Sequence, residues 1–131
     1  MKRSFLLALL ISTFSLAMAQ TVYNASGQRI ATFNNGTFSN ASGQRIGTFN
    51  GTTISNEMGQ RLGEKNGGNY TNQSGQRIGN VSGNYAYNAS GQRIAQFDDK
   101  NIYNASGQRI ATLDGLTRTQ AVVYYLYFMK K

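Results

Sequence analysis

Residues 24–30 read Asn-Ala-Ser-Gly-Gln-Arg-Ile, and this stretch decides the fold because it returns along the chain. Its Gly-Gln-Arg part recurs every sixteen residues and divides the chain into six units without an insertion. In every unit, position four is Asn, position ten is Ile or Leu, and position eleven is Gly or Ala. A fixed short period is the signature of a repeat protein. The units are 21–36, 37–52, 53–68, 69–84, 85–100 and 101–116.

The turn chemistry of the unit predicts a β-hairpin. Asn at the first turn position accepts from a backbone N–H two residues on, and Gly at the fourth adopts a positive φ at no steric cost. This pattern indicates a type I turn with a glycine bulge, which pairs positions four with eight, three with nine and two with ten. Positions two and ten are apolar in every unit, so we expect them to form one buried face. The turn glycines are Gly27, Gly43, Gly59, Gly75, Gly91 and Gly107.

One hairpin is too small to be stable alone, so the units must bury their apolar faces against one another. Radial closure is favoured because it removes exposed strand edges. The predicted fold is therefore all-β, with six tandem hairpins over 20–116 closed as a flower or barrel. The chain ends in a tail, 117–131, in which Ala121–Met129 are nine consecutive apolar residues. Nine residues are too few for a membrane-spanning helix, and we expect this tail to pack on the repeats.

The N-terminus predicts export. Lys2 and Arg3 precede an apolar run from Phe5 to Leu16, and Ala17-Met-Ala19 is a typical cleavage site. We therefore expect 1–19 to be a cleaved signal peptide. The mature protein is then secreted, periplasmic or on the cell surface.

The composition argues against an enzyme. The 131 residues include no His, Cys, Trp or Pro, which excludes a Ser-His-Asp triad, a thiol nucleophile, a zinc finger and disulfides. Asp98 and Asp99 are adjacent in a predicted turn, and Glu57 and Glu64 lie in the most divergent unit. Neither pair offers the two facing carboxylates that a glycosidase requires. We predict no catalytic residue, no metal site and no cofactor.

The basic residues suggest a binding surface. The chain carries thirteen Lys plus Arg against five Asp plus Glu, a net charge of +8. Repetition should place the unit arginines in a ring or ladder, which suits an anionic polysaccharide or a lipid headgroup. Alternatively, each arginine stacks on its cross-strand tyrosine and keeps a solvated face soluble. Nucleic acid is not expected as the partner of an exported protein. The candidate ligand-binding residues are Arg29, Arg45, Arg61, Arg77, Arg93 and Arg109, with Gln28, Gln44, Gln60, Gln76, Gln92 and Gln108.

The repeated Tyr-Asn-Ala-Ser-Gly-Gln-Arg-Ile pattern, after a signal segment and before a short aromatic tail, resembles small secreted bacterial beta-flower proteins. These are known mainly from Bacteroidetes and are built of radially arranged hairpins. The resemblance covers 21–129. It implies the fold, and it brings no activity and no catalytic residues.

These observations predict a non-enzymatic β-repeat protein of the cell envelope, structural or ligand-presenting, whose working surface is the Gln-Arg face. The alternative is a self-assembling matrix subunit resembling curli-type fibre proteins, since Gly, Asn and Gln-rich repeats without Pro also suit fibres. Against it, stacked arginines without acidic partners repel one another. An inhibitor or toxin-neutralising role is also open and has no positive evidence.

Overall fold

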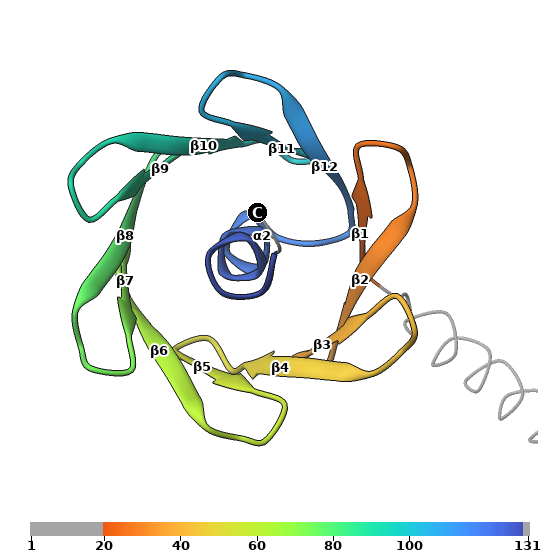
Figure 1. The fold of residues 1–131 in the computed structure, drawn as a ribbon, viewed down its shortest axis with the longest axis horizontal. Helices are drawn as coiled ribbons and strands as arrows, with labels where there is room; N and C mark the ends of the chain where they lie inside the picture. Colours follow the sequence, from red (N-terminus) through yellow and green to blue (C-terminus); the bar gives the residue numbers. More distant parts are fainter. Residues whose placement is uncertain (1–19, 130–131) are drawn as a thin grey trace, which may run out of the picture.

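Twelve antiparallel strands close into one barrel (Figure 1), as the sequence predicted. The structure is a computed structural model that describes residues 20–129; the predicted signal segment and the last two residues lie outside the described part. Neighbouring strands in the sequence pair in the barrel, and β1 pairs with β12 to close it. The strands are β1 Gln20–Asn24, β2 Arg29–Asn34, β3 Thr37–Asn40, β4 Arg45–Phe49, β5 Thr53–Asn56, β6 Arg61–Asn66, β7 Asn69–Asn72, β8 Arg77–Ser82, β9 Tyr85–Asn88, β10 Arg93–Phe97, β11 Asn101–Asn104 and β12 Arg109–Asp114.

The tip of each hairpin has the predicted turn. In the first unit, Asn24 Oδ1 accepts from the backbone N–H groups of Ser26 at 2.9 Å and Gln28 at 3.0 Å. The N–H of Gly27 donates to the Asn24 carbonyl at 3.0 Å, and Gly27 has a φ of 85°. The same bonds recur in the other five units. The side-chain carbonyl of Asn thus replaces a backbone acceptor and holds the turn closed.

The predicted pairing of positions two and ten is wrong by one residue. Tyr23 lies opposite Arg29 as expected, but Val22 lies opposite Ala31. Ile30 is the extra residue of a β-bulge, and the register shifts at the same place in every unit. The buried apolar residues of the first unit are therefore Val22, Ala31 and Phe33, with Ile30 half-buried beside them.

Short connectors join each unit to the next at the opposite end of the barrel. Between β2 and β3, Asn35 and Gly36 both have positive φ, 50° and 82°, as a type I′ turn requires. We call this end the connector end, and the end that carries the Asn-x-x-Gly turns the tip end.

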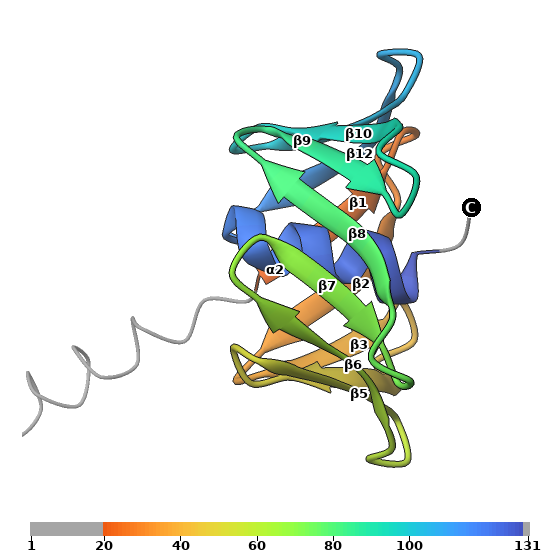
Figure 2. The ribbon, with the colours of Figure 1, turned by 90° about the vertical axis from the view of Figure 1, so that its left-hand side faces the viewer.

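The C-terminal segment is a helix inside the barrel (Figures 1 and 2). It begins as α2, Arg118–Val123, and continues as η1, a π-helix over Tyr124–Phe128. The side chain of Thr117 accepts from the N–H of Gln120, whose side chain in turn accepts from the N–H of Thr117. The helix runs along the barrel axis from the connector end to the tip end (Figure 2). Neither helix within residues 20–129 combines the length and apolarity needed to cross a membrane.

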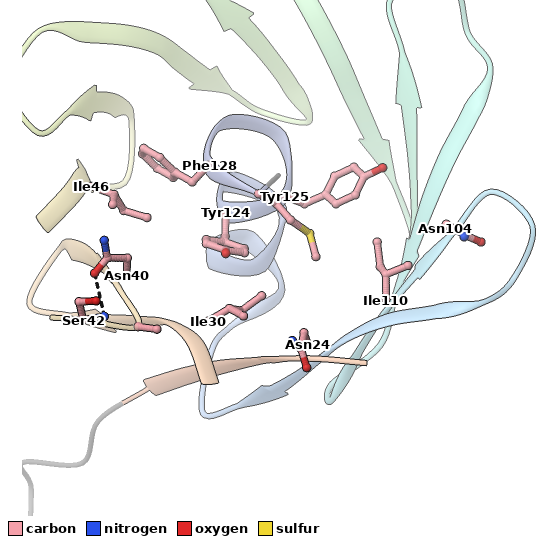
Figure 3. A pocket seen from close by; sticks show the side chains of 12 residues that line it. Asn24, Ile30, Asn40, Ser42, Ile46, Asn104, Ile110, Tyr124, Tyr125 and Phe128 are labelled. Carbon is pink, nitrogen blue, oxygen red and sulfur yellow. Dashed lines mark hydrogen bonds between the residues drawn. The ribbon is translucent and has the colours of Figure 1, made fainter. Parts of the chain in front are cut away.

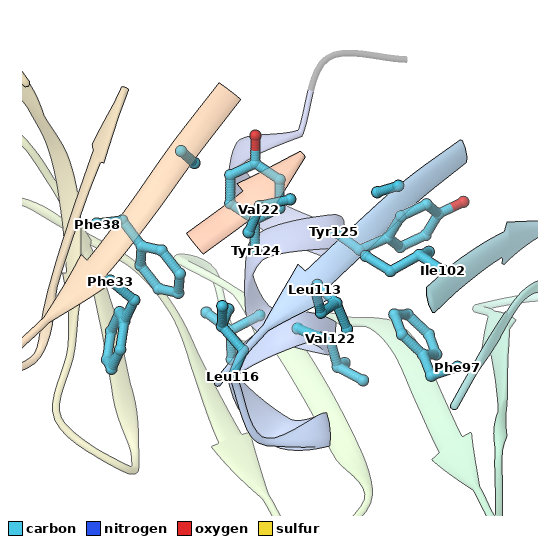
Figure 4. Packing of buried hydrophobic residues seen from close by; sticks show 14 of the residues in the cluster. Val22, Phe33, Phe38, Phe97, Ile102, Leu113, Leu116, Val122, Tyr124 and Tyr125 are labelled. Atoms are coloured by element: carbon cyan, nitrogen blue, oxygen red, sulfur yellow. The ribbon is translucent and has the colours of Figure 1, made fainter. Parts of the chain in front are cut away.

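Aromatic side chains fill the space between helix and barrel (Figure 4). The ring of Phe38 lies 5.9 Å from that of Tyr124 and 5.2 Å from that of Phe128, and Phe97 meets Tyr125 edge-on at 5.8 Å. These contacts bury the apolar face of every hairpin against one central element, which explains how six weak hairpins are stable together.

The small residue at position eleven makes room for the helix. A Cβ on Gly47 would overlap the ring of Phe128, and one on Gly63 would lie 2.8 Å from the Tyr127 hydroxyl. A Cβ on Gly79 would meet Leu126 at 3.5 Å, an ordinary contact. Three successive helix residues, Leu126, Tyr127 and Phe128, therefore pack on the glycines of three successive units.

Candidate functional site

The predicted arginines are exposed at the tip end of the barrel, one on each hairpin. Arg29 Nη2 donates to the carbonyl of Ala41 in the next tip at 3.3 Å, and Arg45 Nη2 donates to that of Glu57 at 2.6 Å. Arg61 and Arg77 reach the next tip in the same way, at 3.1 and 3.4 Å. The structure thus arranges the arginines around one rim, where these four also link neighbouring hairpins.

The predicted glutamines are held within their own tips. Gln28 Oε1 accepts from Asn24 Nδ2 at 3.0 Å. The other five units repeat this bond. The amide oxygen of each glutamine is therefore engaged with the turn, and its amide nitrogen is the group left to face a ligand.

The alternative role of the arginines, stacking on tyrosine, is seen at one place within residues 20–129. Arg93 lies over the ring of Tyr85, 5.0 Å from its centroid. Tyr87 is the residue directly opposite Arg93 in the strand pairing. The contact is therefore diagonal, and Tyr85 lies outside the cross-strand pair that the sequence predicted.

Charge is distributed unevenly between the two ends. Asp98, Asp99 and Asp114 lie at the connector end, so three of the five acidic residues are remote from the rim. Glu57 lies in the third tip, and Glu64 pairs with Arg61 at 3.5 Å, the one ion pair within residues 20–129. The tip end therefore carries an excess of positive charge.

The acidic residues at the connector end serve the loop in which they lie. Asp98 Oδ1 accepts from the N–H of Lys100 at 2.9 Å, and Asp98 Oδ2 accepts from the Tyr103 hydroxyl at 3.2 Å. These hydrogen bonds, the one from Lys100 first, lower the pKa of Asp98. Within residues 20–129, no three acidic side chains gather as a metal site would need.

A cavity of about 760 Å³ opens at the tip end (Figure 3). Ile30, Ile46 and Ile110 point into it from the barrel, opposite Tyr124, Tyr125 and Phe128 of the helix. The other lining residues are Asn24, Asn40, Ala41, Ser42, Asn104 and Met129. The barrel walls of the cavity thus come from the first, second and sixth units. Sequence reasoning placed the position-ten residues on the buried face but missed the cavity, because the cavity depends on where the helix lies inside the barrel.

A second cavity, of about 310 Å³, lies at the connector end. Lys65 lines it at position thirteen, where the other units have Phe33, Phe49, Val81, Phe97 and Leu113. Arg118 also lines it, and its Nη1 donates to the Gly83 carbonyl at 2.7 Å and to Asn84 Oδ1 at 2.6 Å. A lysine at a repeat position that is otherwise apolar was the sequence signal for this cavity.

The pKa values of two tyrosines are strongly raised. Burial raises the pKa of Tyr70 to about 12, and burial together with the nearby Tyr70 raises the pKa of Tyr127 to about 12. The Tyr127 hydroxyl donates to the carbonyl of Thr71 at 2.6 Å. Both residues face the lumen and tie the helix to the barrel, so their shifts concern stability.

The fold agrees with a known family. The family model described as a 5-fold beta-flower protein matches the chain twice, over residues 12–85 and 46–129. The two matches overlap, which a tandem repeat allows because a model can align to it in more than one register. No curated protein and no solved structure matches the chain. Together the two matches span nearly all of the chain, which therefore belongs to the 5-fold beta-flower family.

Proposed function

We propose that this beta-flower protein is an exported, non-enzymatic binding module of the bacterial cell envelope. Its working surface is the tip-end rim, which holds an anionic polysaccharide or an anionic lipid headgroup. Export rests on the N-terminal sequence, and the absence of catalysis rests on the composition and on the separation of the acidic residues.

The charge distribution carries the proposal. The arginines recur around one rim, and the nearest acidic side chains are confined to the third unit. Each guanidinium has five N–H donors, so the bond from Arg29 to the Ala41 carbonyl leaves most of its donors for a ligand. Six equivalent cations on one barrel also favour a repeated anion through multivalency.

The same rim has a structural role, which the test must separate from binding. Arg77 donates to the next tip, so its removal affects both the charge and a link between hairpins. Substitution in pairs, with a pair from the other end as the control, keeps the change in net charge equal.

The test measures binding to immobilised heparin and to vesicles that contain an anionic phospholipid, each at low and at physiological salt. Removing two rim cations, Arg77→Gln with Arg109→Gln, should weaken binding by about two- to thirtyfold, since both arginines are exposed and an exposed ion pair contributes about 0.2–1 kcal/mol. The matched control, Lys65→Gln with Lys100→Gln, should change it far less. Equal losses in the two pairs would show that only net charge matters, and an unchanged affinity of the rim variant would refute the proposal.

The alternative function, a fibre subunit, gains no support from the closed barrel. Each of the twelve strands described is paired on both sides, including β1 with β12, so the barrel over 20–114 offers no open edge for strand addition. Self-association through other surfaces stays a prediction. Light scattering on the purified protein tests it by measuring the size of the particles in solution.

A further inference from the structure

The cavity at the tip end is a space between the helix and the barrel that the packing leaves unfilled. Its volume, about 760 Å³, falls within the range of about 300–1,000 Å³ that is typical of small-molecule sites. It lies between the helix and the barrel, where Ile30, Ile46 and Ile110 form one wall and aromatic rings form the other (Figure 3).

The wall chemistry selects an apolar occupant. Most of the wall is apolar: Ile, Phe and Met offer no strong hydrogen-bond partners, and of the two tyrosines Tyr125 already donates to the Ile94 carbonyl at 3.3 Å. A sugar placed there would leave most of its hydroxyl groups unsatisfied, at a cost in free energy. A hydrocarbon chain loses nothing there, because it exchanges contact with water for contact with other apolar atoms.

The mouth of the cavity has the opposite character. Asn24, Asn40 and Asn104 line it from three hairpin tips. Ala41 lines it as well, and the carbonyl of Ala41 accepts from Arg29 Nη2 at 3.3 Å. The guanidinium of Arg29 therefore contacts a residue that lines the cavity, and no acidic residue lines the cavity.

We propose that this cavity receives the hydrocarbon chain of a single-chain anionic amphiphile, whose headgroup lies at the mouth beside Arg29. The proposal rests on the proposed function for the headgroup, since both place an anion at the rim. It adds the ligand class: an acyl chain enters the barrel, and the ligand is a fatty acid or a similar amphiphile. A polysaccharide does not fit this cavity.

The first test compares octanoate, decanoate, dodecanoate and tetradecanoate by calorimetric titration of the purified protein, each below its micelle concentration. Each added methylene should raise the affinity roughly fourfold until the cavity is full, after which the affinity should level off. Affinity that does not depend on chain length overturns the proposal.

The second test fills the cavity from its wall. Ile46→Phe and Ile110→Phe each enlarge the side chain by about the volume of one methylene, so each should weaken dodecanoate binding roughly fourfold. The control is Ile78→Phe, which changes the same repeat position in a unit that does not line the cavity. Thermal unfolding checks that all three variants fold. Equal losses in the variants and the control overturn the proposed location.

The third test separates the chain from the headgroup. Dodecanoate should bind more tightly than dodecanol, and Arg29→Gln should remove that difference while it leaves dodecanol binding unchanged. Equal affinity for the two ligands in the unaltered protein overturns the headgroup assignment and weakens the proposed function with it. Heparin binding without chain-length dependence leaves the proposed function standing and overturns the inference made here.

Discussion

Replacing Gly63 with Ala should destabilise the protein, although Ala occupies the same repeat position in three other units. The neighbouring strand and the helix together explain the difference. A Cβ on Gly63 would overlap the carbonyl of Thr71 and lie 2.8 Å from the Tyr127 hydroxyl. That hydroxyl donates to the Thr71 carbonyl at 2.6 Å, so the new methyl group would enter the place where helix and barrel are joined.

The expected cost follows from two terms. Overpacking a well-filled interior costs about 1–3 kcal/mol. Displacing the Tyr127 hydroxyl from its acceptor adds up to about 1–3 kcal/mol if the hydroxyl is left buried without a partner. Against these, replacing Gly with Ala lowers the entropy of the unfolded chain and stabilises by about 0.4–1 kcal/mol. We expect a net loss of about 1–4 kcal/mol.

Gly79→Ala is the matched control because it makes the same chemical change at the same repeat position. Its Cβ would lie 3.3 Å from the carbonyl of Tyr87 and 3.5 Å from Leu126, so the neighbouring atoms would need to shift by only a few tenths of an ångström. The control should therefore be neutral, or more stable by up to about 1 kcal/mol. Urea unfolding of both variants gives the difference in the free energy of unfolding, provided that the slopes agree.

The result that would refute this reasoning is equal stability of the two variants. It would mean that neither the Thr71 carbonyl nor the Tyr127 hydroxyl approaches Gly63 as described. A larger loss in Gly79→Ala than in Gly63→Ala would place the helix in a different rotation inside the barrel.

Three further predictions concern pH, turns and the connector end. The folded protein raises the pKa of Tyr70 and Tyr127 from 10.0 to about 12, so the free energy of unfolding should be constant below pH 10 and fall between pH 10 and 12. Tyr127→Phe should reduce that fall. Urea unfolding at each pH measures both. Gly75→Val should cost about 1–2 kcal/mol, since φ is 85° and a Cβ there meets nothing within 4 Å, while Gly75→Asn should cost less; equal melting temperatures for both and the unaltered protein would contradict the turn. Lys65→Phe, which restores the apolar residue of the other units, should raise the free energy of unfolding by about 1–2 kcal/mol, and an unchanged or lower melting temperature would show that Lys65 is not directed into the lumen.

The sequence predicted the hairpins because their turns are local. The bonds of Asn24 join residues within four positions of one another, and a positive φ at Gly27 depends on its immediate neighbours. Such features repeat wherever the residues repeat. The period does not distinguish a closed ring from an open stack; closure was expected because it covers strand edges, and the structure and the family match agree with it.

The lumen could not be predicted in the same way. The bulge at Ile30 shifts the register by one residue, which the apolar pattern conceals because positions ten and eleven both face inward. The apolar run at 121–129 allowed several placements, and only the packing shows a helix on the barrel axis. The cavity depends on which units the helix approaches closely, and a helix has no six-fold symmetry to match the ring.

The pairing of β1 with β12 also has a kinetic consequence. Every other strand pair joins neighbours in the sequence, so those pairs can zip together as soon as their turns form. The last pair brings Thr21 opposite Asp114 and must close a loop of almost the whole barrel, which costs about 2–3 kcal/mol more entropy than a short turn. Gln20 Nε2 then donates to the Gly115 carbonyl at 2.7 Å and to Gln120 Oε1 at 3.2 Å, and these bonds tie the β1–β12 pair to the start of the helix. Until β1 pairs with β12, each of them has an unpaired strand edge. The longer the folding chain stays in this open state, the longer these edges can pair with another chain.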